Sequence, residues 1–157
     1  MKTDDNSAKV GFPPPFVYVG ILLIGLVVDR MVGFAGIGLP LPLQYLLVAA
    51  TVGPGIALIL LAIFGFRAAG TPAEPWREVT AFVTIGVYRF TRNPMYLGMA
   101  GIYTGLALGI NSAAALLLLP VAIFAIRTQV IAREEAYMTM TFGTPYIDYC
   151  KRVRRWL

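Results

Sequence analysis

Two polar clusters interrupt an otherwise apolar sequence, and their residue types could bind a charged ligand. The first cluster is Arg92-Asn93-Pro94-Met95-Tyr96-Leu97-Gly98, and the second is Arg133-Glu134-Glu135. One apolar hairpin separates the two clusters, so both should reach the same face of a membrane. We therefore expect Arg92, Asn93, Tyr96 and the two glutamates to share one pocket at that interface.

The adjacent glutamates give the strongest functional signal in this arrangement. Acidic side chains gain little from anionic headgroups and cost free energy near hydrocarbon, so they indicate a cation, on a ligand or on a nearby arginine. Arg92 or Tyr96 alone is typical of ordinary interfacial anchoring. The sequence has no histidine, which excludes histidine-based zinc sites and imidazole bases, and we expect no metal centre.

The composition indicates an integral membrane protein with one domain, residues 1–157. Of its 157 residues, 58% are hydrophobic and 13% are charged, and the mean hydropathy is +0.73. A soluble domain of this size could not bury so much apolar surface. Four apolar segments, at about residues 16–34, 43–66, 95–110 and 113–126, predict an all-α helical bundle of four transmembrane helices with a cytoplasmic C-terminal helical cap.

The distribution of basic residues predicts the orientation in the membrane. All of the thirteen lysines and arginines except Arg30 lie before the first segment, between the second and third, or after the fourth. With four spans, the positive-inside rule then places both termini in the cytoplasm. The net charge of +5 indicates contact with anionic membrane lipids. We expect no nucleic-acid partner, because the chain contains no soluble basic domain to bind one.

Three further features leave alternatives open. Gly98, Gly101, Gly105 and Gly109 favour close helix packing, which permits either a monomer or a homodimer, although Gly98 and Gly101 could instead leave room for a cofactor. The loop 71–76, rich in proline, could form a wall of the pocket or merely connect two helices. The aromatic residues of the segment 137–156 fit an interfacial helix or a lid over the site.

These motifs resemble those of a known superfamily of integral membrane methyltransferases, which includes the isoprenylcysteine carboxyl methyltransferases and the phospholipid methyltransferases. The segment 88–98 resembles the superfamily's Arg-His/Asn-Pro-x-Tyr-x-Gly signature, and Glu134-Glu135 matches its following glutamate pair. Residues 142–149 resemble its Phe-Gly-x-x-Tyr-x-x-Tyr run, and residues 153–157 resemble its ending. The resemblance covers roughly residues 65–157, and the order and separation of the motifs make it fairly specific.

The resemblance implies that S-adenosylmethionine is the methyl donor and that it binds in a region of about residues 88–149. It also implies a lipid-like methyl acceptor that reaches the site from the bilayer. Carried over residue by residue, the resemblance implies a cofactor pocket formed by Arg92, Asn93, Pro94, Tyr96, Gly98, Glu134, Glu135, Tyr146 and Tyr149. Among these, Glu134, Glu135 and Arg92 are the candidate catalytic residues.

The sequence leaves the acceptor open between a prenylcysteine-type carboxylate and a phospholipid amine. Asn93 stands where carboxyl methyltransferases usually have histidine, which favours the amine, whereas the Arg155-Trp156 ending resembles the carboxyl branch. An amine must lose a proton, which Glu134 or Glu135 could accept, whereas Arg92 or Arg133 could position a carboxylate.

The main alternative is a non-enzymatic four-span scaffold or accessory protein, with the glutamates neutralised by Arg127 or Arg133 and without a pocket. A small transporter is a weaker alternative, because no charged residue lies in the middle of a span. A small soluble acceptor, such as a thiol, would remove the need for an entrance that faces lipid.

Overall fold

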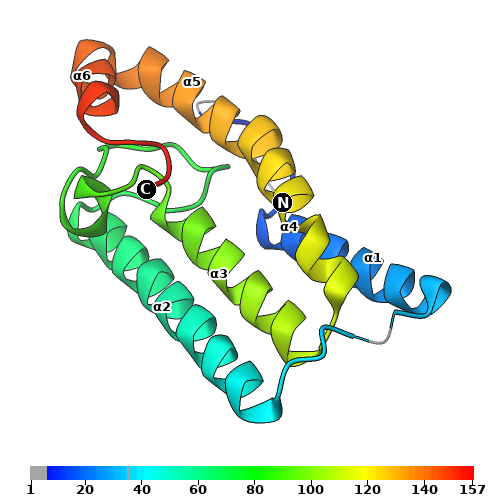
Figure 1. The fold of residues 1–157 in the computed structure, drawn as a ribbon. Coiled ribbons are helices and arrows are strands. Elements are labelled where there is room, and N and C mark those ends of the chain that lie inside the picture. Colours follow the sequence, from blue (N-terminus) through cyan, green and yellow to red (C-terminus); the bar gives the residue numbers. More distant parts are fainter. Residues whose placement is uncertain (1–6, 35) are drawn as a thin grey trace.

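The computed structural model describes residues 7–34 and 36–157, and in this part of the chain every regular element is a helix and no strand occurs. Pro15 and Pro94 stand in the first turn of their helices, where the missing N–H costs no hydrogen bond. Figure 1 shows the arrangement of the elements α1 (Pro15–Val32), α2 (Leu41–Ala68), the 3₁₀ turn η1 (Gly86–Arg89), α3 (Pro94–Gly109), α4 (Ala113–Ile126), the π turn η2 (Arg127–Ile131), α5 (Ala132–Phe142) and α6 (Thr144–Arg152).

Three helices are long and apolar enough to cross a membrane: Pro15–Val32, Leu41–Ala68 and Ala113–Phe142. The third of these joins α4, whose bounds agree with the predicted segment 113–126, to η2 and α5 in one continuous helix. No glycine or proline occurs between Ile126 and Gly143, and the backbone therefore continues from α4 through η2 into α5. All four predicted helices are present, but α3 has only 16 residues, about 24 Å at roughly 1.5 Å per residue.

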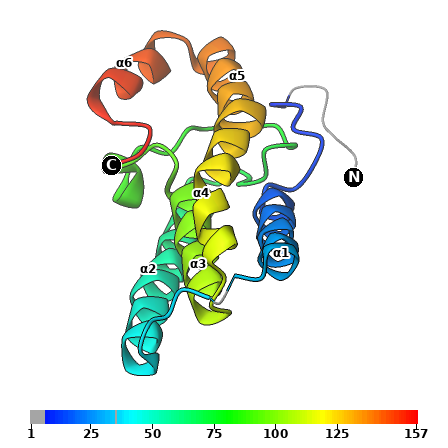
Figure 2. The ribbon, with the colours of Figure 1, turned by 45° about the vertical axis from the view of Figure 1, so that its right-hand side comes forward.

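The helices α1 to α4 form one curved layer, in which α3 lies between α2 on one side and α1 with α4 on the other (Figures 1 and 2). The contact between α2 and α3 is close because glycines meet there. A Cβ on Gly98 would lie 2.5 Å from the Gly55 carbonyl oxygen, and one on Gly55 would lie 2.7 Å from the Gly98 carbonyl oxygen. A Cβ on Gly101 would likewise lie 3.1 Å from the Thr51 carbonyl oxygen. This stripe of glycines therefore packs two helices of the same chain together.

The ends of α3 and α4 that meet near residue 111 are closed by polar side chains from other helices. The Asp29 carboxylate of α1 accepts hydrogen bonds from the Ser112 hydroxyl and, at 3.0 Å, from the Ala114 N–H. Gln44 Nε2 of α2 donates to the Leu108 carbonyl oxygen at 2.6 Å. These bonds satisfy backbone groups that a helix end leaves unpaired. Asp29 therefore has a structural role at this end of the bundle.

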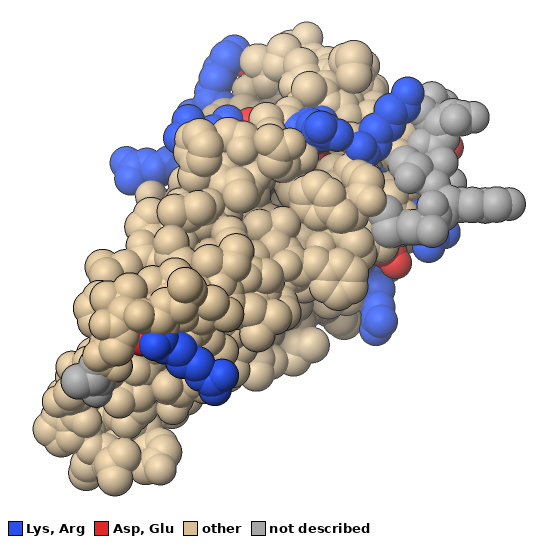
Figure 3. All heavy atoms as spheres, turned by 90° about the vertical axis from the view of Figure 1, so that its right-hand side faces the viewer, with Lys and Arg blue, Asp and Glu red and all other residues tan. Residues whose placement is uncertain are grey.

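The opposite end of the layer carries the polar parts of the chain. There α5, α6 and the segment that joins α2 to α3 extend beyond the helices of the layer (Figure 1). Figure 3 shows lysine and arginine side chains gathered mostly toward this end, whereas most of the remaining surface in that view is neither basic nor acidic. The fold thus brings the two polar clusters of the sequence to one end of the molecule.

Candidate active site

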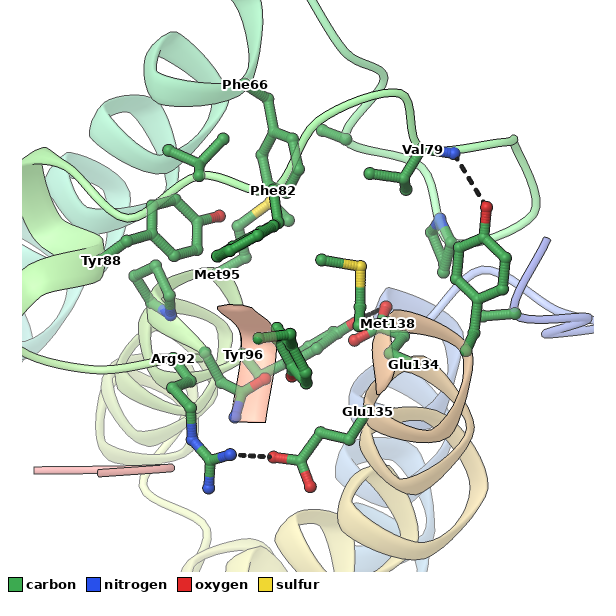
Figure 4. Close-up of a pocket in the computed structure, with 18 of the residues that line it drawn as sticks. Phe66, Val79, Phe82, Tyr88, Arg92, Met95, Tyr96, Glu134, Glu135 and Met138 are labelled. Atoms are coloured by element: carbon green, nitrogen blue, oxygen red, sulfur yellow. Dashed lines mark hydrogen bonds and ion pairs between the residues drawn. The ribbon is translucent and has the colours of Figure 1, made fainter. Parts of the chain in front are cut away.

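A cavity lies where α5 and α6 approach the start of α3. It encloses about 780 Å³ of empty space when the solvent at its open mouth is included. Its walls come from the end of α2, the loop 72–83, the first turn of α3, and α5 and α6 (Figure 4). Most of its aromatic lining comes from Phe66, Phe82, Tyr88, Tyr96, Tyr146 and Tyr149.

Glu135 is held by two arginines from different parts of the chain. Arg155 contributes two bonds, from Nε to Oε1 at 3.1 Å and from Nη2 to Oε2 at 2.5 Å, and Arg92 Nη1 lies 3.2 Å from Oε1 (Figure 4 shows the Arg92 contact). The exposed fractions of the Glu135 and Arg92 side chains are 18% and 15%, so solvent screens these pairs only in part. Bidentate bonds of this kind fix the geometry of a carboxylate.

Glu134 has different partners, although it is the next residue in the sequence. The Tyr96 hydroxyl donates to Glu134 Oε1 at 2.5 Å. Within residues 7–34 and 36–157, no lysine or arginine forms an ion pair with Glu134. Successive residues of a helix point about 100° apart, which is why the two carboxylates can face different neighbours. Glu134 therefore lines the cavity as a carboxylate that no lysine or arginine of the described chain neutralises.

The Arg92 side chain has one polar atom without a partner. Its Nε is buried and makes no hydrogen bond to any described residue, whereas its Nη1 pairs with Glu135. A buried donor without an acceptor is costly and therefore calls for an explanation, such as a group that is absent from the structure.

Asn93 holds the C-terminal segment of the chain. Its Nδ2 donates to the Arg155 carbonyl oxygen at 3.0 Å, and the Thr91 hydroxyl donates to the same oxygen at 3.1 Å. The Arg92 N–H donates to the Arg154 carbonyl oxygen at 2.9 Å. The asparagine therefore lines the cavity, but its amide nitrogen bonds to backbone and not to the open space.

Two tyrosines of α6 close the cavity. The ring centroid of Phe82 lies 5.8 Å from that of Tyr146 and 6.1 Å from that of Tyr149, and the Tyr149 hydroxyl donates to the Tyr88 carbonyl oxygen at 2.8 Å. Burial raises the pKa of Tyr149 to about 12, although the nearby Arg92 guanidinium opposes this shift. The hydroxyl therefore stays protonated at neutral pH and remains a donor.

The loop between α2 and α3 forms a wall of the cavity and does not merely connect the two helices. Its residues 72–75 line the cavity, and the Val79 N–H donates to the Tyr137 hydroxyl of α5 at 3.2 Å (Figure 4). The N-terminal segment adds Ala8 to the lining, and Arg133 Nη1 donates to the neighbouring Lys9 carbonyl oxygen at 3.2 Å. Arg133 thus holds a backbone segment and does not neutralise the glutamates.

Most of the residues predicted from the sequence meet around this cavity. Its lining includes Arg92, Asn93, Pro94, Tyr96, Glu134, Glu135, Tyr146 and Tyr149. Gly98 is the exception: it does not line the cavity but packs against Gly55 of α2, because it shares the helix face of Gly101 and Gly105. Four residues of the site were not predicted as site residues from the sequence: Phe66, Phe82, Tyr88 and Arg155. For Arg155 the only signal was its place in an ending that resembles the superfamily.

The described chain is a helical protein with three helices long and apolar enough to cross a membrane, and it has at one end a cavity lined by aromatic and charged side chains. The family model of phospholipid methyltransferase matches residues 43–145, well over half of the 157 residues. The chain therefore belongs to the phospholipid methyltransferase family. No curated protein and no solved structure matches it in the same comparisons. The family match ends within α6 and does not reach Tyr146, Tyr149 or Arg155.

Proposed function

We propose that the protein is a membrane methyltransferase that uses S-adenosylmethionine to methylate a lipid-like amphiphile. Family membership supports methyl transfer in general. The observation that carries the specific proposal is the polar lining of the cavity. Among the described residues, no cation neutralises the Glu134 carboxylate and no acceptor bonds to the buried Arg92 Nε.

The residues around the cavity fit this donor chemically. A sulfonium and an ammonium group are both attracted by a carboxylate and by aromatic faces, and the cavity offers Glu134 with Tyr96, Tyr146 and Tyr149. The donor's carboxylate group would suit Arg92, whose Nε lacks an acceptor in the described chain. When bound, S-adenosylmethionine supplies an electrophilic methyl group, and no metal is required for its transfer.

The tasks left to the protein are alignment, exclusion of water and removal of a proton. The loop 72–83 and α6 enclose the cavity with apolar and aromatic side chains, which keep water from the reacting atoms. For an amine acceptor, the nitrogen must lose one proton as it gains the methyl group, and Glu134 can accept that proton. Tyr96 orients the Glu134 carboxylate by its hydrogen bond at 2.5 Å.

The amine acceptor is the better supported of the two substrate classes. A carboxylate acceptor would need a second arginine beside the one assigned to the donor, Arg92, but Arg133 bonds to the Lys9 carbonyl oxygen. A carboxylate acceptor would also be repelled by the negative charge of Glu134. A phospholipid amine meets neither obstacle, and it would place its positive charge beside Glu134 before it loses a proton.

We also propose that α3 completes a fourth crossing and that both termini are cytoplasmic. α3 begins at the cavity and ends where Asp29 and Gln44 close the opposite end, so it spans the layer between two longer helices. Its 16 residues are short for a hydrocarbon core of about 30 Å, and local thinning or the flanking residues would cover the difference.

Transfer of a labelled methyl group tests the function. The purified protein would be placed in vesicles that contain either phosphatidylethanolamine or a prenylcysteine carboxylate, with S-adenosylmethionine labelled in its methyl group. We expect label in the phospholipid amine, and a loss of at least tenfold in rate for Glu134→Gln. The exposed Asp148→Asn variant, which loses the same charge on α6, should keep the wild-type rate.

Label in the carboxylate substrate alone would reverse the choice of acceptor. Label in neither substrate, with a folded protein that binds the donor, would indicate a small soluble acceptor. No binding of the donor would favour a scaffold.

A further inference from the structure

The C-terminal segment after α6 folds back against the start of α3 and places one side chain, that of Arg155, against Glu135, which lines the cavity. Its backbone is fixed by three hydrogen bonds: from the Arg92 N–H to the Arg154 carbonyl oxygen, and from Thr91 and Asn93 to that of Arg155. These bonds hold the segment without any contribution from the Arg155 side chain. That side chain instead extends to Glu135 of α5, which lies 20 positions earlier in the sequence.

Arg155 is the principal partner of Glu135. It binds both carboxylate oxygens, whereas Arg92 approaches only Oε1, at 3.2 Å. Without Arg155, the Arg92 guanidinium would be the only cation of the described chain in contact with Glu135, and it could rotate to bind both carboxylate oxygens. The Arg92 Nε would then be drawn into the ion pair and would no longer be available to a ligand.

We propose that Arg155 is a positioning residue that fixes Glu135 and thereby keeps Arg92 available to the methyl donor. This inference rests on the proposed function, because it assigns the donor's anionic group to Arg92. It also divides the glutamate pair: Glu135 is a structural counter-charge, whereas Glu134 is the carboxylate that meets the ligand. Arg155 itself lines no part of the cavity, so it acts through Glu135 and Arg92.

A purely structural role for Arg155 would be the anchoring of the C-terminal segment. The anchoring bonds use backbone carbonyl oxygens, so substitution of the Arg155 side chain leaves them in place. The neighbouring Arg154 provides a matched control, because its side chain is exposed and its carbonyl oxygen takes part in the same anchoring. Arg154→Gln removes the same charge from the same segment without touching Glu135.

The test is calorimetric titration of the detergent-purified protein with S-adenosylhomocysteine, for the wild type and for Arg155→Gln, Arg155→Lys and Arg154→Gln. We expect roughly tenfold weaker binding for Arg155→Gln, because loss of a bidentate partner disturbs both charges beside it. Arg155→Lys keeps the positive charge but cannot form the bidentate pair with Glu135, so this variant should bind with intermediate affinity. Arg154→Gln should bind as the wild type does.

Coupling to Glu135 distinguishes positioning from a general loss of structure. If Arg155 acts through Glu135, the double variant Glu135→Gln/Arg155→Gln should bind no more weakly than Glu135→Gln alone, within about twofold. The intermediate affinity of Arg155→Lys carries the test even if the glutamine variant unfolds. Wild-type affinity in both Arg155 variants, or additive losses in the double variant, would overturn the inference and leave the proposed function standing. Failure of the wild type to bind would overturn both.

Discussion

Glu134 and Glu135 are neighbours in the sequence but have separate roles in the structure. Glu135 is neutralised by Arg92 and Arg155, whereas Glu134 receives only the Tyr96 hydroxyl as a described partner. The sequence shows that the pair needs a cation, but it does not show which carboxylate receives it. That assignment depends on the C-terminal segment, which returns to the site through tertiary contacts.

The two glutamates should therefore respond differently to the same substitution. Glu135→Gln leaves two arginines without their carboxylate and should reduce the free energy of unfolding by about 1–3 kcal/mol. Glu134→Gln keeps a hydrogen-bond acceptor for Tyr96 and should change stability little while abolishing methyl transfer. Thermal unfolding in detergent, followed by circular dichroism, measures the first effect. Equal destabilisation by both substitutions would contradict the division of roles.

Asn93 acts on the C-terminal segment, which leads to a second prediction. Asn93→Ala removes one of the two side-chain bonds to the Arg155 carbonyl oxygen, so the segment should detach more often. We expect faster tryptic cleavage after Arg152 and Arg154 and lower methyltransferase activity. Cys150→Ala, in the adjacent helix, should change both measurements less. Identical cleavage rates in the two variants would exclude the anchoring role.

At the scale of elements, the apolar segments and the proline and glycine residues that flank them predicted the bounds of the helices well. The bounds of α1, α2 and α3 lie within about two residues of the predicted segments, because prolines and a glycine with positive φ mark their ends. The bounds of α4 agree with the predicted segment 113–126, whereas its continuation through η2 into α5 was not predicted, because polarity changes at Arg127 while nothing there breaks the helix. Gly98 was assigned to the cavity because it stands in the signature segment, although its helix face packs against α2.

The close contact of α2 with α3 gives a prediction at this scale. Gly98→Ala would place a Cβ 2.5 Å from the Gly55 carbonyl oxygen, so the helices must separate, at a cost of about 1–3 kcal/mol. Gly109→Ala, on the same helix, would meet only Val48 at an ordinary 3.6 Å and should be neutral or slightly stabilising. The comparison of their unfolding temperatures tests the packing role. Equal temperatures would contradict it.

At the scale of the whole molecule, most of the basic residues lie toward the same end as the cavity, opposite the Asp29 and Gln44 caps, and Arg30 beside Asp29 is an exception. The sequence predicted this polarity from the positive-inside rule, because charge distribution does not depend on tertiary detail. In contrast, the layer order of the helices and the return of the C-terminal segment could not be read from composition. Both arise from specific contacts between residues far apart in the sequence.

This polarity predicts which engineered cysteines can be labelled from each side of the membrane. In a Cys150→Ala background, Arg152→Cys should react with a membrane-impermeant maleimide only after the cells are opened. Phe34→Cys, at the opposite end of the bundle, should react with intact cells. The reverse pattern would show that the protein has the opposite orientation in the membrane. Labelling of both positions from one side would show that the chain does not make an odd number of crossings between them.

The central claim is that the cavity binds S-adenosylmethionine through Glu134 and Arg92. The most direct measurement is calorimetric titration of S-adenosylhomocysteine into the wild type and Glu134→Gln, with Asp148→Asn as the exposed control. The account predicts micromolar binding by the wild type and the control, and at least a tenfold loss in Glu134→Gln. Absence of binding in a folded, monodisperse wild-type sample would contradict it, as would equal affinity in all three proteins.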